Sequence, residues 1–503
     1  MNWNKLLNNS RRKDKHKQVA DPSVEGQKKQ GTSAGREEIE RDFDRILFLA
    51  PTRRLADKTQ VFPLEQNDSV RTRLTHSFEV SNLARGIGTR LAFDHPEIFD
   101  GHALDARGDR IERTIPSLLA AIGLAHDLGN PPFGHQGESA IRDWFKKNKE
   151  MVFESDLENP LYQDFLKFDG NSQTIRLLTQ LQILNDKFGI NLTYSTLAAL
   201  VKYPLSSKAV DSHPTWEKHG FFASEEAIIK ETWEETGLQE GVRHPLTYIM
   251  EACDDIAYSV LDAEDIVKKG LASFYDLVNH LSTFVAEKNT EIQSSTEEKQ
   301  DSELITKMKE EVQVIESLVG KIKEKNEEYS KEDLSPAELN DLSMQMFRVF
   351  AIGALVESVI EAYVQQQPLI QNTEAPPQDL MSLSKGKALC KALKKFDKKW
   401  GYRNKSVLKL ELEGCNYIQE LMSMLWIGIH GKLNDDNKHE SDTPFGKYAY
   451  EKISENYRRV FEDKSNDLPV PYKESQLLTD AISGMTDSYL IALHTELKNL
   501  YRE

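Results

Sequence analysis

Two side chains of metal-binding type stand next to each other at the end of an apolar run in this sequence. The run ends in His126 and Asp127, and the Gly-Asn-Pro-Pro segment at 129–132 follows. Glycine and proline stop a helix and force a turn. A second helical pattern opens near His135 and places Glu138 one turn further on. Two helices joined at such a corner can direct imidazoles and carboxylates into one small volume.

Further candidate ligands lie on other predicted helices. His76 opens an apolar stripe with spacings of three and four residues, and Asp254, Tyr258 and Asp262 stand at i, i+4 and i+8 of another helical pattern. A carboxylate that faces a core needs a metal, a cation or hydrogen bonds. The alternative interpretation, a helical core with hydrogen-bonded histidines, leaves Asp127 and Asp254 without partners.

His76, His126, Asp127 and Asp254 together make a mixed nitrogen and oxygen ligand set. Such a set suits Mn²⁺, Fe²⁺, Co²⁺, Ni²⁺ or Zn²⁺, with Mg²⁺ less favoured by the nitrogen ligands. A divalent ion of this kind polarises phosphorus–oxygen bonds. A histidine near a neutral pKa is suited to proton transfer, so a further imidazole oriented by a carboxylate, as in His135 with Glu138, adds acid–base chemistry.

The composition limits the class of protein. The chain has 503 residues, 39% of them hydrophobic, and a net charge of −17, which argues against a surface made wholly for nucleic acid. Cys253, Cys390 and Cys415 are widely spaced and form no CxxC pair, which predicts a reduced, cytoplasmic protein without disulfides. No run of about 18 apolar residues occurs, so we expect no membrane span.

Helical periodicity is frequent and strand signals are sparse, which predicts an all-α fold. We expect four parts: a flexible basic arm over residues 1–36, a catalytic helical core over 37–284, a charged amphipathic helical insertion over 285–340 that forms one long helix or part of a hairpin, and a C-terminal helical region over 341–503 that packs on the core and completes the site or an oligomer interface. The arm is either solvated or in contact with nucleic acid or a neighbouring subunit.

One dense group of cations leaves two interpretations open. Arg53, Arg54 and Lys58 stand beside apolar residues, either as a surface charge run or as a wall that faces phosphate or sugar.

Several segments together resemble one known family, the HD-domain deoxynucleoside triphosphate triphosphohydrolases of the dGTPase type. The matching segments are Arg53–Phe62, Arg73–His76, His126–Glu138, Phe168–Asn171, Lys202–Pro204 and Asp254–Tyr258, with a weaker match at Leu410–Gly414. The strong matches lie within residues 41–270. The resemblance implies an HD-domain helical core and hydrolysis of a dNTP, such as dGTP, to a deoxynucleoside and inorganic triphosphate.

The resemblance also implies a role for each candidate residue. It assigns one divalent ion, most favourably Mn²⁺, to four ligands: His76, His126, Asp127 and Asp254. It assigns proton transfer to His135 with Glu138, either to activate water or to protonate the 5′-oxygen as it leaves. It assigns phosphate contacts to Arg73, Lys202 and Tyr203. It assigns deoxyribose contacts to Gln60, Val61, Tyr258 and Asp262.

Family members assemble into homo-oligomers, commonly hexamers, and some bind single-stranded DNA or a regulatory nucleotide, so the resemblance implies these partners besides the dNTP substrate. Two other functions stay open. One is an HD-type phosphohydrolase acting on another nucleotide phosphoester. The other is a nucleotide-sensing or single-stranded-DNA-binding assembly protein with a decayed site, against which the complete ligand set counts.

Overall fold

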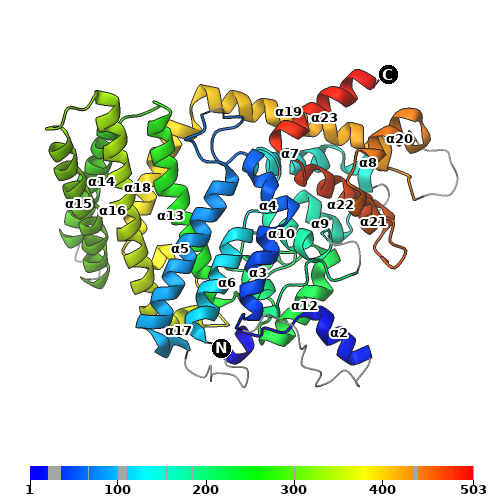
Figure 1. Ribbon diagram of the computed structural model, residues 1–503, viewed down its shortest axis with the longest axis horizontal. Helices are drawn as coiled ribbons and strands as arrows, with labels where there is room; N and C mark the ends of the chain where they lie inside the picture. Colours follow the sequence, from blue (N-terminus) through cyan, green and yellow to red (C-terminus); the bar gives the residue numbers. More distant parts are fainter. Residues whose placement is uncertain are drawn as a thin grey trace.

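The structure is a computed structural model that describes residues 1–20, 35–65, 67–99, 110–153, 157–182, 186–297, 302–433 and 440–501. Over these residues the chain is built from helices (Figure 1), and the β-type contacts are isolated bridges, such as that between Arg11 and Thr193. The predicted all-α fold is therefore confirmed.

The helices of the N-terminal half are α1 (Trp3–Leu6), α2 (Arg12–Ala20), α3 (Glu38–Leu47), α4 (Ala50–Arg54), α5 (Arg73–Asp94), α6 (Ile111–Ala125), α7 (Gly134–Lys147), α8 (Lys149–Phe153), α9 (Gln163–Leu166), α10 (Gly170–Thr179), α11 (Tyr194–Leu200), α12 (Glu226–Thr236) and α13 (Pro245–Lys268). Those that follow are α14 (Phe274–Glu297), α15 (Ser302–Tyr329), α16 (Pro336–Gln365), α17 (Gln367–Ile370), α18 (Lys387–Asp397), α19 (Lys405–Ile429), α20 (Pro444–Glu451), α21 (Glu455–Phe461), α22 (Val470–Ser483) and α23 (Asp487–Leu500). A π-helical segment, η8 (Lys398–Tyr402), joins α18 to α19.

Two groups of buried apolar side chains hold these helices together. The first core joins α3, α5, α6, α11 and α13 to α15, α16 and α18. The second core joins α7, α8 and α9 to α19, α20, α21, α22 and α23. Leu128, just after α6, belongs to the first core, whereas Phe133, just before α7, belongs to the second. The predicted turn at 129–132 therefore carries the chain from one core to the other.

The first twenty residues do not form the flexible arm that their composition predicts. They contain α1 and α2, and Trp3 is buried. Arg11 is also buried and forms ion pairs with Asp42 at 2.6 Å and Glu38 at 2.7 Å. The prediction is wrong here because a count of Lys and Arg does not reveal which acidic partners the fold brings to them. Residues 21–34 of the predicted arm lie outside the described residues.

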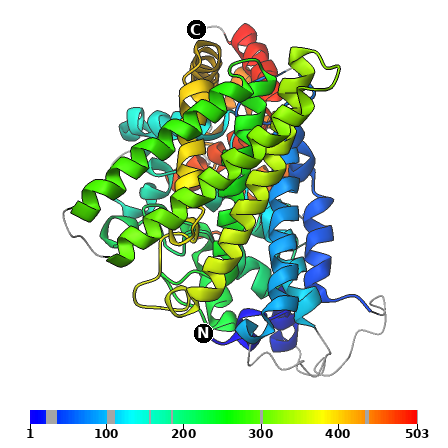
Figure 2. The same cartoon turned by 90° about the vertical axis from the view of Figure 1, so that its left-hand side faces the viewer.

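The described residues of the charged segment 285–340 are mainly helical, as predicted, and most of them lie in α14 and α15, which pack against each other (Figure 2). Val312, Ile315 and Ile322 of the predicted stripe are buried, whereas Leu304 is exposed. Helix α15 also packs against α16 and α18, so this hairpin covers one side of the first core, on the left in Figure 1. The division of the chain into four domains stays a prediction.

Among the described residues, none of the helices is both long and apolar enough to cross a bilayer. Cys253, Cys390 and Cys415 are all free thiols, as the sequence predicts.

Candidate metal centre and substrate cavity

Three helices of the first core position the predicted metal ligands. His76 lies in the first turn of α5, a helix that Thr72 caps, since its side chain accepts a hydrogen bond from the Thr75 N–H. His126 directly follows the last residue of α6, and Asp254 lies in the middle of α13. Helices α5, α6 and α13 all pack against one another, so residues far apart in the chain meet between them.

The four predicted ligands lie together. Nε2 of His76 is 3.1 Å from Oδ1 of Asp254, and Nε2 of His126 is 3.5 Å from the same oxygen. Nε2 of His126 is also 3.5 Å from Oδ1 of Asp127. One ligand atom from each of His76, His126 and Asp127 can be chosen so that all three lie within 4.8 Å of one another. The neighbouring Asp255 points elsewhere, since its carboxylate pairs with Lys394 at 2.6 Å.

His126 shows that a cation fits between these side chains. Its Nδ1 donates a hydrogen bond to the Gly123 carbonyl at 2.7 Å, which leaves Nε2 as the free ring nitrogen. This Nε2 is buried and has no hydrogen-bond partner among the described residues. Burial lowers the pKa of His126, but the carboxylates of Asp127 and Asp254 outweigh it and raise the pKa to about 9. The site therefore favours additional positive charge, which a divalent ion supplies.

Cationic and amide side chains contact the carboxylates of Asp127 and Asp254. Arg73 donates to Oδ2 of Asp127, and Asn130 donates to its Oδ1 at 2.6 Å. Burial alone would raise the pKa of Asp127, but the charges of His126 and Arg73 hold it well below its ordinary value. Lys202 lies 3.5 Å from Oδ2 of Asp254. Such outer contacts orient metal ligands and keep them ionised.

The turn between the two cores has an unusual backbone. Phe133 and Gly134 have φ angles of 59° and 54°, so two successive residues adopt the left-handed region. Gly129 is required for a different reason, since a Cβ there would come within 2.2 Å of the Thr174 backbone nitrogen. The sequence correctly predicts that one helix ends and another begins around this turn.

Helix α7 begins directly after the turn and carries the predicted catalytic pair. Nδ1 of His135 lies 3.1 Å from Oε2 of Glu138, whose Oε1 accepts a hydrogen bond from the Gly170 N–H at 2.8 Å. The imidazole is 75% exposed, whereas the carboxylate is 4% exposed. The hydrogen bond to Glu138 raises the pKa of His135 above its ordinary value. A fixed, buried carboxylate thus orients an accessible imidazole.

A cavity of about 570 Å³ opens beside the predicted metal ligands and the predicted catalytic pair. Its lining includes six of the seven predicted substrate-binding residues: Gln60, Val61, Arg73, Lys202, Tyr203 and Tyr258. The seventh, Asp262, does not line it. Asp262 is buried behind the wall and accepts a hydrogen bond from the Tyr402 hydroxyl, and the Tyr402 ring lies 5.8 Å from that of Tyr258.

Sequence patterns did not identify several lining residues. They are Lys218, Lys398, Tyr402, Arg403 and Leu408, while Asn171 and Glu411 lie in matching segments for which no individual role was predicted. Lys218 pairs with the buried Asp169 at 2.7 Å. Asp169 belongs to the Phe168–Asn171 segment, and a buried aspartate needs a cationic or hydrogen-bonding partner, but the sequence does not say which lysine supplies it.

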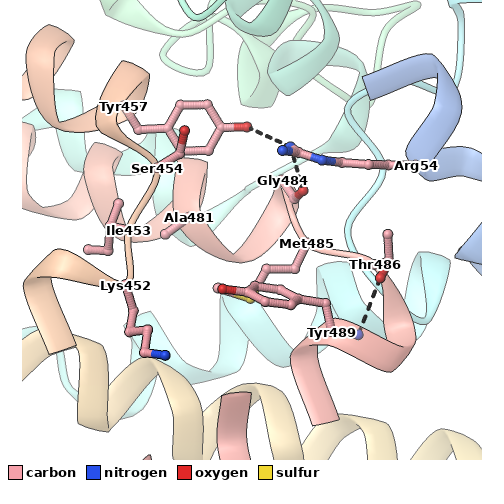
Figure 3. Close-up of a pocket in the computed structure, with 10 residues that line it drawn as sticks. All are labelled: Arg54, Lys452, Ile453, Ser454, Tyr457, Ala481, Gly484, Met485, Thr486 and Tyr489. Atoms are coloured by element: carbon pink, nitrogen blue, oxygen red, sulfur yellow. Dashed lines mark hydrogen bonds between the residues drawn. The ribbon is translucent and has the colours of Figure 1, made fainter. Parts of the chain in front are cut away.

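The arginine and lysine cluster near residue 54 does not form a phosphate-facing or sugar-facing wall of this cavity. Arg54 borders a separate hollow of about 400 Å³, where it donates to the Gly484 carbonyl at 3.0 Å and points toward the Tyr457 hydroxyl (Figure 3). That hollow is lined by Arg54, Lys452, Ile453, Ser454, Tyr457, Ala481, Gly484, Met485, Thr486 and Tyr489, which include no metal-ligand carboxylate or imidazole. Lys58 is buried and binds two backbone carbonyls.

An all-helical fold with a cluster of histidine and aspartate side chains that could hold a metal ion fits a protein of the HD type, and the family model of the HD domain matches residues 73–167. A deoxyguanosinetriphosphate triphosphohydrolase-like protein of Listeria monocytogenes is 33% identical over 511 aligned residues, covering 99% of this chain and 100% of that protein. A protein of the same name from Synechocystis is 31% identical over 92% and 93% of the two chains. The deoxyguanosinetriphosphate triphosphohydrolase of Yersinia pestis is 30% identical over 90% and 92%. The chain belongs to this deoxyguanosinetriphosphate triphosphohydrolase-like family of HD-domain hydrolases.

Proposed function

We propose that this protein hydrolyses deoxynucleoside triphosphates, dGTP among them, to a deoxynucleoside and inorganic triphosphate with the help of one divalent metal ion. The observation that carries the proposal is the convergence of His76, His126, Asp127 and Asp254 beside a cavity that also contains an oriented imidazole. Relatives that match nearly the whole chain and bear the name of this activity support it.

The reaction forms a bond between a water oxygen and the α-phosphorus and breaks the bond between that phosphorus and the 5′-oxygen. A divalent ion held by the four ligands would supply Lewis-acid polarisation of the phosphate. His135 either takes a proton from the attacking water or gives one to the departing 5′-oxygen, and Glu138 fixes its ring through Nδ1 so that Nε2 is free to act.

The cavity wall divides into a phosphate side and a sugar side. Arg73, Lys202 and Tyr203 supply positive charge and a hydroxyl for the phosphates. Gln60, Val61 and Tyr258 line the region proposed for deoxyribose, and the buried side-chain oxygen of Gln60 has no hydrogen-bond partner among the described residues. A closed wall at the 2′-position excludes a ribose hydroxyl by its bulk, while polar groups that need a 3′-hydroxyl enforce its presence.

Asp262 lies behind the sugar side of the wall, where its Oδ2 accepts a hydrogen bond from the hydroxyl of Tyr402, a residue that itself lines the cavity. We therefore assign Asp262 to the sugar side as an acceptor that the tyrosine holds in place.

The remaining parts of the proposal come from the family resemblance. They are Mn²⁺ as the favoured ion, a homo-oligomer such as a hexamer, and a regulatory nucleotide or single-stranded DNA as further partners. A cytoplasmic location is predicted instead from the widely spaced cysteines. Each of these stays a prediction.

Product analysis tests the proposal. The protein is incubated with Mn²⁺ and each of the four dNTPs, and phosphorus NMR identifies the inorganic product. We expect triphosphate, and we expect its release to disappear in His126→Ala. Orthophosphate or pyrophosphate as the product would instead indicate a different phosphohydrolase, and tight nucleotide binding without turnover would indicate a sensing protein.

A further inference from the structure

The turn that precedes the catalytic helix needs support from outside itself. Phe133 has a φ of 59°, a conformation that side chains larger than glycine rarely adopt, and it is the residue from which α7 begins. Such a backbone persists only where surrounding contacts hold it. His135 stands two residues later in the first turn of the helix. The contacts that hold Phe133 therefore also decide where the His135 imidazole points.

One of these contacts comes from the start of α23, more than 350 residues away in the sequence. Oδ1 of the buried Asp487 accepts a hydrogen bond from the Phe133 N–H at 3.1 Å. Its Oδ2 accepts from the Thr59 N–H at 2.9 Å and from the Thr59 hydroxyl. A single carboxylate thus joins the turn to the segment that carries Gln60 and Val61 on the cavity wall.

A second contact comes from α19. A Cβ added to Gly414 would lie 2.5 Å from Cγ of Phe133, so the phenyl ring rests directly on the helix backbone at this glycine. The ring is buried in the second core. This packing gives a physical reason for the glycine in the Leu410–Gly414 segment, whose role neither the metal centre nor the cavity explains.

A third contact joins the same two regions. The ammonium group of Lys58 donates to the Asn130 carbonyl at 2.6 Å and to the Ser483 carbonyl at 2.7 Å. Asn130 lies in the turn and Ser483 is the last residue of α22. We call Gly414, Ser483 and Asp487 the C-terminal clamp, because each contacts the turn or the segment beside it from the C-terminal region.

We propose that Gly414 and Asp487 are positioning residues for the catalytic pair, since they hold Phe133 in the conformation that sets the first turn of α7. The inference rests on the proposed function, because the pair acts on a phosphate ester only if that function holds. None of the four metal ligands is a direct hydrogen-bond or packing partner of Gly414 or Asp487, so loss of either contact to Phe133 should leave metal binding intact.

Gly414→Ala is the principal variant, and Gly353→Ala is its matched control. Gly353 also lies within a helix, but a Cβ there meets nothing within 4 Å. We expect Gly414→Ala to lower kcat for triphosphate release by about 10- to 100-fold, the size of effect that a small misplacement of a reacting group produces. KM and Mn²⁺ binding, measured by titration calorimetry, should stay within about twofold, and Gly353→Ala should match the unaltered protein.

Asp487→Asn is the second variant, and it decides the question if Gly414→Ala does not fold. It keeps the shape of the side chain but replaces one acceptor oxygen with a donor group, so contact with either Phe133 or Thr59 is lost. We expect a smaller fall in kcat in the same direction, again with metal binding retained.

A titration of His135 by NMR of ring-labelled histidine gives a readout that needs no substrate. The groups that face His135 are Glu138, whose hydrogen bond raises its pKa, and Arg73 and Lys218, whose charges lower it. If the clamp sets the first turn, Gly414→Ala should separate His135 from Glu138 and move the pKa down. An unchanged titration and kcat in both clamp variants, or Mn²⁺ binding lost in step with kcat, would overturn the inference. Absence of triphosphate release by the unaltered protein would refute the proposed function instead, and the titration would still test the clamp.

Discussion

The two cores that flank the cavity build their halves of the site in different ways. The first core supplies His76, His126 and Asp254 from long helices whose buried faces pack side by side. The second core supplies His135 and Glu138 from the first two turns of α7, after a left-handed backbone step that distant residues contact. The proposed metal ligands are fixed by the packing of their helices, whereas the proposed catalytic pair follows a turn that is in contact with the C-terminal region.

This difference implies that metal binding and proton transfer are separable properties of the molecule. Changes in the first core should remove the ion and all activity together. Changes in the second core should spare the ion and slow only the chemical step.

The largest effect is expected from His126→Ala. Loss of one ligand from the four should abolish Mn²⁺ binding, and loss of metal polarisation, which contributes several kcal/mol, should slow triphosphate release by about 10³-fold or more. Calorimetry and a product assay measure the two effects. His95→Ala, at the end of α5, is the control and should change neither. An active His126→Ala protein would contradict the assignment of the metal site.

The next largest effect is expected from His135→Ala. Removal of a general acid or base lowers kcat by about 10²- to 10⁴-fold. Because His135 lies in the second core's half of the site, Mn²⁺ binding should be unchanged, in contrast to His126→Ala. Steady-state kinetics and calorimetry on the same preparation separate the two variants. A His135→Ala protein that loses the metal would show that the two halves are not independent.

A smaller effect should appear in the pH profile of Glu138→Gln. The Glu138 hydrogen bond raises the pKa of His135 above its ordinary value of about 6.5, so removing the carboxylate charge should lower it. If His135 acts as the acid, kcat falls above its pKa, and if it acts as the base, kcat falls below it. In either case the descending part of the kcat–pH profile that reports His135 should move to lower pH. A shift on the alkaline side identifies His135 as the acid, and a shift on the acidic side identifies it as the base. Glu150→Gln, at an exposed position on α8, should leave the profile unchanged.

The smallest effect, on the free energy of unfolding, is expected from a change on the proposed sugar side of the cavity. Tyr402→Phe removes the hydroxyl that donates to Asp262, whose pKa burial raises. The loss of a donor to a buried acceptor should lower the free energy of unfolding by about 1–3 kcal/mol, measured by urea denaturation. Tyr448→Phe, whose hydroxyl contacts Glu496 at the surface, is the control and should change stability by less than about 0.5 kcal/mol. Equal losses in both variants would argue against a special role for the buried contact.

The site residues that could be predicted from the sequence are those marked by a pattern in their own segment of the chain. His76 and Asp254 stand in helical patterns, and the helix that ends beside His126 is marked by glycine and prolines a few residues later. Arg54 and Lys58 do not form the phosphate-facing or sugar-facing wall that was one of two interpretations of their sequence. The packing around a short helix sets the direction of its side chains, and the sequence pattern does not reveal that packing.

The contacts that escaped sequence reasoning join distant segments. The pairing of Phe133 with Gly414 and Asp487 connects residues separated by roughly half the chain or more, and nothing in either segment names the other. Tyr402 lies in the π-helical segment η8, where its hydroxyl donates to the buried Asp262, a residue that the family resemblance had assigned to the deoxyribose. The basic N-terminal residues pair with acids for the same long-range reason.

The central claim, that water attacks the α-phosphorus beside the four metal ligands, is tested most directly by hydrolysis of dGTP in water labelled with oxygen-18. Mass spectrometry of the products should find the label in inorganic triphosphate and none in the deoxynucleoside. Label in the deoxynucleoside, or in orthophosphate or pyrophosphate in place of triphosphate, would contradict the proposed reaction.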